Sequence, residues 1–585
     1  MCANWQEKVK PDTQRPKYLL KKQFLYSLVF LLSVNVSAQE GAGYFRWPVD
    51  GAISLSANYG ELRSNHFHAG LDIRVGGVPG MPVYAAADGY VSRIAVRPDG
   101  YGRAVYITHP NGTTSVYAHL HTFAPALKAY IEAIQYARQR YTVDEQIAAN
   151  VLPVKKGQLI GAAGNSGSSA GAHLHFEIRH TDTETPRNVF SYGYYPLLTD
   201  TYAPVIRRVA FFSFRRQGDI PSSANFYERR NPARRVQQTV HVPDTFYIGI
   251  DAYDSQNGTP AKLAVNRALV TLDGATVFSC RFEDISFDAM RYINSAIAYE
   301  ERQRNNKVFL KTYIAPGNRL QIYRDVQNSG LISLPDTLPH TMEIKVIDDA
   351  GNHTATAFTV QKKPGSPASL PVPETGTIPV AHWDTPAAIV KEGLSVSIPA
   401  GALYQPAELF IDTIAGKPDG AYSPLWRIHT PETPLHYAMT LKIAADMPDT
   451  LFPKALIAGI TGNHIYSCGG QWKNNAVETS TRSFGDFFVT VDTIAPVITP
   501  AFAPNAYLGK QAQLRIKITD NLSGIGSYSG YIDDEWALFE YDAKNRRLLY
   551  TFDARRIKRG RKHRLLLSVT DNKGNTATLQ TAFTW

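Results

Sequence analysis

The chain has few of the features that define several protein classes. It contains only three cysteines in 585 residues, which excludes a fold built on disulfide bonds. Cys280 and Cys468 fall in different predicted modules, so we expect both thiols to be unpaired. The longest apolar run, Phe24 to Val34, is shorter than the roughly 20 residues of a transmembrane helix. The formal charge of +10 is a mild bias, and without a dense basic stripe it does not indicate nucleic-acid binding.

The N-terminal segment has the layout of a secretory signal peptide. Lys21 and Lys22 precede the apolar run, and Val36-Ser37-Ala38 offers small residues for cleavage. We therefore predict a signal peptide over residues 1–38 and an exported protein in the periplasm or cell envelope. After cleavage, no integral membrane segment is expected.

Two short histidine motifs carry the strongest chemical signal. One runs from His68 to Asp72, and the other is the pair His173 and His175. A His-x-His pair on a strand presents both rings on one face, and catalytic zinc takes three N or O ligands and keeps one position open. His68 and Asp72 would lie roughly 13 Å apart in a straight strand, so the chain must bend, most easily at Gly70. One pair among 16 histidines could arise by chance, but two clusters in one domain-sized stretch predict a metal site.

The stretch from Trp47 to about Asn188 resembles the catalytic domain of the LytM/lysostaphin-type zinc metallopeptidases, which cut peptide cross-links in bacterial peptidoglycan. The resemblance covers about a quarter of the chain, with matching order and spacing. Besides the two histidine motifs, the matching segments are residues 47–51, 80–91, 117–120, 154–161 and 164–178.

This resemblance implies a role for each of five side chains. His68, Asp72 and His175 would bind Zn²⁺, and His119 and His173 would form a catalytic pair beside it. The chemistry agrees with these residue types, because zinc activates water and a neutral imidazole can take the water's proton. Which of the two histidines takes the proton and which stabilises the oxyanion stays open.

Several neighbouring polar residues have weaker claims to a role. We interpret His66, His109 and His121 as structural or solvent-facing. Glu177 follows His175 on the same face of a predicted strand. It could accept a hydrogen bond from an imidazole N–H, and it could equally be an ordinary strand residue.

The composition predicts a mainly β protein. We expect an antiparallel β-sheet zinc peptidase domain over residues 39–200, with a helical insert at about residues 123–150, followed by β-sandwich modules of immunoglobulin-like type. Immunoglobulin-like modules are predicted over residues 201–362 and 492–585, and a further β-sandwich module over residues 381–491, with a proline-rich linker over residues 363–380.

An internal repeat supports two of these modules. Asp-Thr-x-Ala-Pro-Val-Ile occurs at residues 200–206 and 492–498, and Asp-x-x-Gly-Asn occurs at residues 348–352 and 571–575, where it predicts a hairpin. Acidic residues of the first copy suggest calcium, but turn chemistry explains them equally well; they are Asp251, Asp254, Asp348 and Asp349. The middle module briefly resembles, at residues 396–403, a short sandwich module of some ankyrins and netrin receptors.

Together these features predict a secreted zinc metalloendopeptidase that hydrolyses peptidoglycan cross-links, with the D-Ala–diaminopimelate bond chosen by family analogy. The partners expected are peptidoglycan and, through the C-terminal modules, other envelope proteins. The alternatives are a non-catalytic envelope scaffold or activator of other wall hydrolases, and an enzyme that cuts proteins. Because all the ligands fall within residues 39–200, we expect this fragment to fold alone, unless the β modules stabilise it.

Overall fold

The computed structural model describes residues 43–51, 53–194, 198–217, 220–232, 239–363 and 380–585. The predicted signal peptide and nearly all of the predicted linker lie outside these residues. Within them the fold is mainly β, as predicted, and strands from every module pair antiparallel. None of the helices described combines the length and apolar character that a membrane span requires.

The N-terminal domain contains two sheets. The larger follows the order β1-β2-β11-β6-β5-β4-β8, with β12 paired to β11 and β9 paired to β4, and the smaller follows the order β3-β10-β7. The strands are β1 (Leu55–Ala57), β2 (Leu71–Arg74), β3 (Pro82–Tyr84), β4 (Gly89–Val96), β5 (Arg103–Thr108), β6 (Thr113–Ala118), β7 (Leu120–Phe123), β8 (Val143–Gln146), β9 (Pro153–Val154), β10 (Leu159–Ala163), β11 (His173–His180) and β12 (Pro186–Arg187). Strand β11 therefore lies between β2 and β6, and this position sets the candidate site.

The predicted insert is helical only over its first half. Helix α2 (Pro125–Arg138) starts with a proline in its first turn and buries Leu127 and Ile131. It stops where Gln139 adopts a left-handed conformation with φ of 47°. The rest of the insert includes β8, which pairs with β4, so the prediction of helix over 123–150 is wrong beyond Arg138. Pairing with the edge of β4 determines the conformation of residues 143–146, whatever the intrinsic helical propensity of the insert.

The first β module combines two sheets that share one apolar core. Their orders are β14-β13-β16-β19 and β15-β22-β21-β17-β18-β20. Its elements are β13 (Val205–Gln217), β14 (Ile220–Arg230), β15 (Thr239–Val242), β16 (Phe246–Tyr253), β17 (Arg267–Leu272), β18 (Ala275–Arg281), α3 (Ile293–Ala296), α4 (Tyr299–Asn305), β19 (Leu310–Lys311), β20 (Tyr323–Val326), β21 (His340–Ile347) and β22 (His353–Lys362).

The middle module has two five-stranded sheets over one core, in the orders β24-β25-β29-β33-β32 and β27-β28-β34-β30-β31, and a short pair β23-β26. Its strands are β23 (Val380–Ala381), β24 (Ala387–Lys391), β25 (Leu394–Ile398), β26 (Ala407–Glu408), β27 (Ile411–Ile414), β28 (Leu425–Ile428), β29 (Met439–Ala444), β30 (Ala455–Thr461), β31 (His464–Ser467), β32 (Gln471–Trp472), β33 (Ala476–Thr481) and β34 (Gly485–Val491).

The last module is again a sandwich, with sheets β35-β37-β41-β40 and β36-β43-β42-β38-β39 over one core. Its strands are β35 (Val497–Pro500), β36 (Ala506–Tyr507), β37 (Gln513–Thr519), β38 (Ile525–Ile532), β39 (Glu535–Trp536), β40 (Glu540–Asp542), β41 (Arg547–Thr551), β42 (Lys562–Asp571) and β43 (Thr576–Thr584). Both predicted Asp-x-x-Gly-Asn hairpins are confirmed, because they join β21 to β22 and β42 to β43. The immunoglobulin-like type of these sandwiches stays a prediction.

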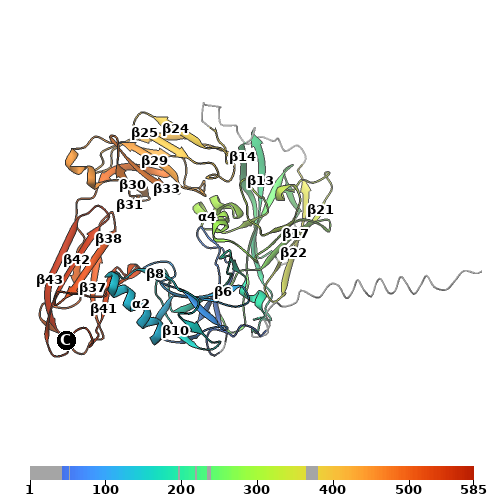
Figure 1. The fold of residues 1–585 in the computed structure, drawn as a ribbon. Coiled ribbons are helices and arrows are strands. Elements are labelled where there is room, and N and C mark those ends of the chain that lie inside the picture. Colours follow the sequence, from blue (N-terminus) through green and yellow to red (C-terminus); the bar gives the residue numbers. More distant parts are fainter. Residues whose placement is uncertain (1–42, 52, 195–197, 218–219, 233–238, 364–379) are drawn as a thin grey trace, which may run out of the picture.

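The last module returns to the first domain, so the chain runs around a ring (Figure 1). Trp536 packs edge-to-face on Tyr136 of helix α2, with ring centroids 5.2 Å apart. The guanidinium of Arg556 lies 3.7 Å from the centre of the same tyrosine ring. Arg103 of β5 forms an ion pair with Glu540 of β40. The contact combines apolar and charged groups, and it joins segments about 400 residues apart.

The first β module is joined to the N-terminal domain by shared core. Tyr59, Phe67 and Ala69 belong to the apolar cluster that also contains the inner faces of that module's sheets. Cys280 and Cys468 are both free thiols, as predicted.

Candidate metal centre

The pairing of two strands brings the histidine motifs together. Strands β2 and β11 run antiparallel, with His175 directly opposite Asp72. His68 lies on the segment just before β2. Gly70 is needed here for space, because a Cβ atom on it would lie 2.3 Å from the carbonyl oxygen of Phe176. The glycine therefore lets the chain between His68 and Asp72 pass close to β11.

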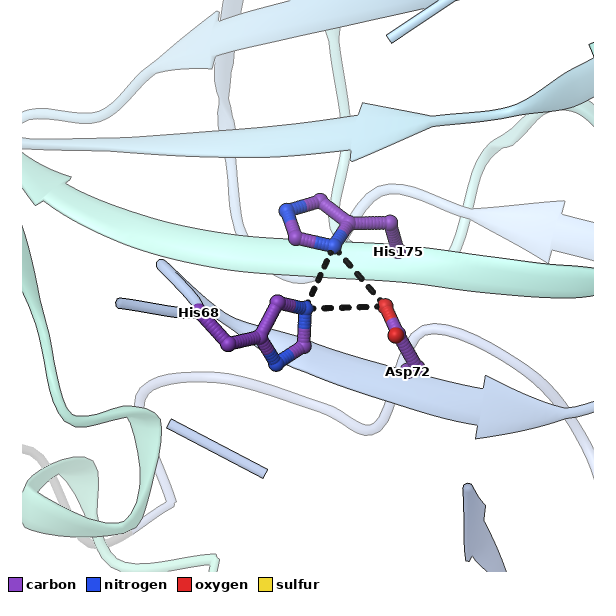
Figure 2. A group of neighbouring side chains, drawn as sticks. All are labelled: His68, Asp72 and His175. Atoms are coloured by element: carbon purple, nitrogen blue, oxygen red, sulfur yellow. Dashed lines mark hydrogen bonds and ion pairs between the residues drawn. The ribbon is translucent and has the colours of Figure 1, made fainter. Parts of the chain in front are cut away.

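The three predicted ligands converge in a buried cluster (Figure 2). His68 Nε2 lies 3.0 Å from Asp72 Oδ1 and 3.0 Å from His175 Nδ1. His175 Nδ1 lies 2.9 Å from Asp72 Oδ1. Each of the three residues is at most 5% exposed. One nitrogen or oxygen from each residue thus faces the same point.

Outer hydrogen bonds orient both imidazoles. His68 Nδ1 donates to the carbonyl oxygen of Asn58 at 2.8 Å, and His175 Nε2 donates to Glu177 Oε1 at 2.7 Å. In the neutral rings, the remaining nitrogens, His68 Nε2 and His175 Nδ1, then carry lone pairs directed at a carboxylate oxygen. With both rings neutral, three electron-rich atoms about 3 Å apart repel one another unless a positive charge, from a proton or a metal ion, lies between them. Two imidazole nitrogens and one carboxylate oxygen fit the donor set of catalytic zinc.

Glu177 accepts a hydrogen bond from His175, which is the first of the two alternatives that the sequence left open. Arg179 Nε lies 2.6 Å from its other oxygen, and the Tyr101 hydroxyl donates to Oε1 at 2.5 Å. Burial opposes its charge, but the Arg179 guanidinium and the His175 hydrogen bond lower the pKa of Glu177 to about 2. Glu177 is therefore a charged acceptor that fixes the orientation of His175.

The charges around the ligands favour an ionised Asp72. Arg63 binds the second carboxylate oxygen of Asp72 at 2.6 Å. Burial opposes the charge, but the His68 imidazole and hydrogen bonds from the surrounding histidines hold the pKa of Asp72 well below its usual range. Burial lowers the pKa of His68. Burial also opposes the charge of His175, but hydrogen bonds to Asp72 and Glu177 raise its pKa to about 9.

His119 and His173 lie beside the three candidate ligands. The His119 ring centroid is 4.9 Å from that of His173 and 5.8 Å from that of His175. His119 Nδ1 donates to the Ser166 carbonyl at 2.9 Å, and its φ of 59° is in the left-handed region. Such strained backbone persists where surrounding structure fixes it, often at functional sites. Burial and the two histidines lower the pKa of His119 to about 3, so its ring is neutral.

His173 reaches the cluster from the start of β11. Its Nε2 lies 3.3 Å from Asp72 Oδ1, and its Nδ1 donates to the Gly171 carbonyl at 2.9 Å. The structure thus gathers all five side chains named from the sequence around one point.

The other three histidines behave as predicted. His66 and His121 are exposed. His109 is buried and bonds through Nδ1 to the Asp88 carbonyl and through Nε2 to Ser115 Oγ, which is a structural role.

Sequence reasoning missed Asn58, Arg63, Tyr101 and Arg179, which hold the candidate ligands and Glu177. Each is a common polar residue in no motif. Arg179 alone had a signal, since it continues the alternation His175, Glu177, Arg179 on one face of β11.

Two family models match parts of the chain. Residues 66–136 match peptidase family M23, and this segment includes His68, Asp72 and His119. Residues 379–492 match a Zu5-like domain, which coincides with the middle module.

Curated relatives match a fifth to a quarter of the chain. They include a protein of Haemophilus influenzae named uncharacterized metalloprotease, 32% identical over 144 residues, which are 24% of this chain and 25% of the relative. Another is DD-carboxypeptidase/endopeptidase Mpg of Neisseria meningitidis, 35% identical over 118 residues, which are 20% of this chain and 21% of the relative. Murein hydrolase activator NlpD of Salmonella typhimurium is 33% identical over 148 residues, 25% of this chain and 31% of the relative. The chain thus spans about a fifth to a third of the length of these relatives.

Solved structures match a similar share of the chain. A zinc containing peptidase from Vibrio cholerae has 25% identity and a TM-score of 0.19 over 26% of this chain and 40% of its own. The catalytic domain of lysostaphin from Staphylococcus simulans has 22% identity and a TM-score of 0.16 over 22% of this chain and 80% of its own. The family match and the named relatives show that the N-terminal domain of this chain is similar to peptidase family M23 and contains a segment that its family model matches.

Proposed function

We propose that this protein is a zinc metalloendopeptidase that hydrolyses peptide cross-links of bacterial peptidoglycan. The observation that carries the proposal is the convergence of His68, Asp72 and His175 at one buried point, with His119 and His173 beside them. A module that only binds a partner does not require three converging metal ligands with two further histidines beside them.

The side chains present suit zinc and the reaction. When bound, zinc would lower the pKa of water and polarise the scissile carbonyl. The outer hydrogen bonds direct the inner nitrogens of His68 and His175 to one point, and a metal bound there would displace the proton of His175, as metal binding requires. His119 is held through Nδ1 by Ser166, so its Nε2 presents a lone pair that can accept a proton. His173 is held in the same way by Gly171.

For the substrate we propose the D-Ala–diaminopimelate bond of peptidoglycan cross-links. The Neisseria meningitidis relative carries the name DD-carboxypeptidase/endopeptidase, and this analogy supports the choice of bond. Peptidoglycan lies outside the cytoplasm, so the proposal agrees with the signal peptide predicted over residues 1–38.

The second candidate function is a non-catalytic activator of other wall hydrolases. It is favoured by the Salmonella typhimurium relative, which is named an activator. The presence of all three candidate ligands in this chain supports the enzyme instead, because an activator does not require a site that can bind metal and water.

Digestion of purified sacculi tests both candidates. The full chain without residues 1–38 is loaded with zinc and incubated with sacculi, and the released fragments are identified by mass spectrometry. We expect cross-linked dimers to be converted to monomers by the wild type and not by Asp72→Ala. If neither protein releases fragments but both accelerate an added wall hydrolase, the chain is an activator. Cleavage of protein substrates without cleavage of sacculi would contradict the proposed substrate.

A further inference from the structure

Three aspartates meet where the first β module begins. Asp200, Asp254 and Asp348 each direct one carboxylate oxygen to a common point, and these oxygens all lie within 4.8 Å of one another. Asp200 starts the module, Asp254 follows β16, and Asp348 follows β21. The three residues are therefore brought together by the fold, because about 50 and 90 residues separate them in sequence.

Two of these carboxylates have an oxygen without a donor. Asp254 and Asp348 are each 3% exposed, and Asp254 Oδ1 and Asp348 Oδ2 have no hydrogen-bond partner in the described structure. Among the described residues, no lysine or arginine forms an ion pair with any of the three aspartates. Leaving a buried charged oxygen unpaired costs several kcal/mol. Turn chemistry therefore does not account for these atoms.

The second copy of the repeat provides an internal comparison. Asp492, Asp520 and Asp571 form an equivalent cluster in the last module. The two copies have an equivalent hydrogen bond. Asn352 donates to the Asp200 carbonyl in the first copy, and Asn575 donates to the Asp492 carbonyl in the second.

The chain itself satisfies two of the three carboxylates of the second cluster. Both oxygens of Asp571 accept hydrogen bonds from within the hairpin, and both oxygens of Asp492 accept backbone N–H groups. Lys573 adds a positive charge that interacts with Asp492 and Asp571. Ala350 occupies the corresponding position of the first copy. One oxygen of Asp520 also lacks a hydrogen-bond partner in the described structure, so the difference between the two clusters is the lysine charge beside the second one.

We propose that Asp200, Asp254 and Asp348 bind a calcium ion. Hard divalent cations prefer carboxylate oxygens. Ca²⁺ takes six to eight oxygen ligands, whereas Mg²⁺ usually keeps several waters and binds through only one or two carboxylates. Three carboxylates in one cluster therefore favour the larger ion. Backbone carbonyls and water would complete the coordination shell.

The calcium site lies beside the contacts that hold the candidate zinc ligands. Asp349, next to Asp348, accepts hydrogen bonds from Asn188 at 2.7 Å and from Asn58 at 3.3 Å. The Asn58 carbonyl is the atom that orients His68. Bound calcium would therefore stabilise the hairpin that anchors Asn58.

Calcium titration of the full chain tests the proposal. The protein without residues 1–38 is stripped with a chelator, given one equivalent of zinc, and titrated with CaCl₂ in a calorimeter. We expect one Ca²⁺ per chain in the wild type and in Asp288→Asn, which changes an exposed carboxylate of the same module. Asp254→Asn removes one charged ligand at constant size and should weaken binding about tenfold or more.

Thermal unfolding gives a second readout. Without calcium, Asp254→Asn should unfold at or above the wild-type temperature, because it removes repulsion among buried carboxylates. With millimolar calcium, the wild type and Asp288→Asn should gain stability and Asp254→Asn should not. If Asp254→Asn is insoluble, Asp348→Asn serves the same purpose.

Three results would overturn the assignment. In the first, the wild type binds no calcium up to millimolar concentration. In the second, Asp254→Asn or Asp348→Asn binds calcium as tightly as the wild type. In the third, the wild type binds Mg²⁺ more tightly than Ca²⁺. Loss of binding in Asp571→Asn with retention in Asp254→Asn would place the ion in the last module and would also contradict it.

Discussion

The ammonium group of Lys544 donates a hydrogen bond to the carbonyl oxygen of Ser169 at 2.6 Å, across 375 positions of the sequence. The same group binds the carbonyl and side-chain oxygens of Asn165. These residues lie in the loop between β10 and β11, and Ser169 Oγ is 3.2 Å from Nδ1 of His173. The last module thus holds a loop of the candidate active site.

Replacing Lys544 should therefore affect turnover without affecting the metal. Lys544→Met removes the contacts that position the loop before His173. We expect kcat on cross-linked muropeptides to fall about tenfold or more, because small displacements of catalytic groups are costly, while bound zinc stays at one per chain. Lys510→Met, an exposed lysine of the same module, is the control. A rise in kcat would show instead that the last module obstructs the site.

The three candidate ligands should be distinguishable from neighbouring histidines by metal content. Asp72→Ala and His68→Ala each remove a ligand. We expect elemental analysis of these purified proteins to find little zinc, and we expect His66→Ala to retain it, because His66 is exposed and its ring bonds to the Ser64 carbonyl. Full zinc content in Asp72→Ala would exclude the assignment.

His119 and His173 should be needed for turnover and dispensable for metal. Loss of a group that transfers protons typically lowers the rate by about 10²–10⁴-fold. We expect reductions of this size in His119→Ala and His173→Ala, with zinc content equal to that of the wild type. Wild-type activity of His173→Ala on cross-linked muropeptides would remove it from the mechanism.

The sequence predicted which side chains lie in the candidate site but not which residues position them. His68, Asp72, His119, His173 and His175 lie in short motifs whose spacing reflects the chemistry. Their supports come from distant segments with no motif. Lys544 reaches the site only because the chain closes into a ring, and no local pattern encodes that closure.

The fold was predictable to a similar degree. Strand alternation and turn residues indicated the sandwich modules, since both features are local. The division of the insert into α2 and β8 was not predictable, because the edge of β4 decides it. The sequence also did not predict that Phe67 of the N-terminal domain packs in the core of the first β module. An apolar residue next to His68 could belong to the core of either domain.

Acid should loosen the contact between the first and middle modules. His436 stacks on Tyr292 with ring centroids 4.1 Å apart, and burial and nearby arginines lower the pKa of His436 to about 4. In the unfolded chain the pKa of this histidine is near 6.5. Between pH 6.5 and 4 the unfolded chain therefore binds more protons at His436 than the folded chain does. The free energy of unfolding consequently falls as the pH falls through this window.

Thermal unfolding at a series of pH values tests this. His436→Gln should unfold with a weaker dependence on pH between 6.5 and 4 than the wild type, while the exposed His464→Gln should follow the wild type. Identical pH profiles for the wild type and His436→Gln would assign the acid sensitivity to other groups.

The N-terminal domain should not fold without the first β module. Tyr59 and Phe67 are at most 2% exposed and lie in that module's core, and burial of one such side chain contributes about 1.5–3 kcal/mol. In addition, Arg302 of α4 binds the Arg63 carbonyl and Ser64. These contacts favour the stabilising role that the sequence left as the alternative, against independent folding of residues 39–200.

Two fragments separate these possibilities. We expect residues 39–200 to be insoluble or to bind no zinc, and residues 39–362 to be soluble, to bind one zinc and to unfold cooperatively. The longer fragment lacks Lys544, so its kcat on dimeric muropeptides should match that of full-length Lys544→Met, because both have lost the same support of the loop before His173. A soluble, zinc-bound fragment of residues 39–200 with the activity of the longer one would show that the shared core is dispensable.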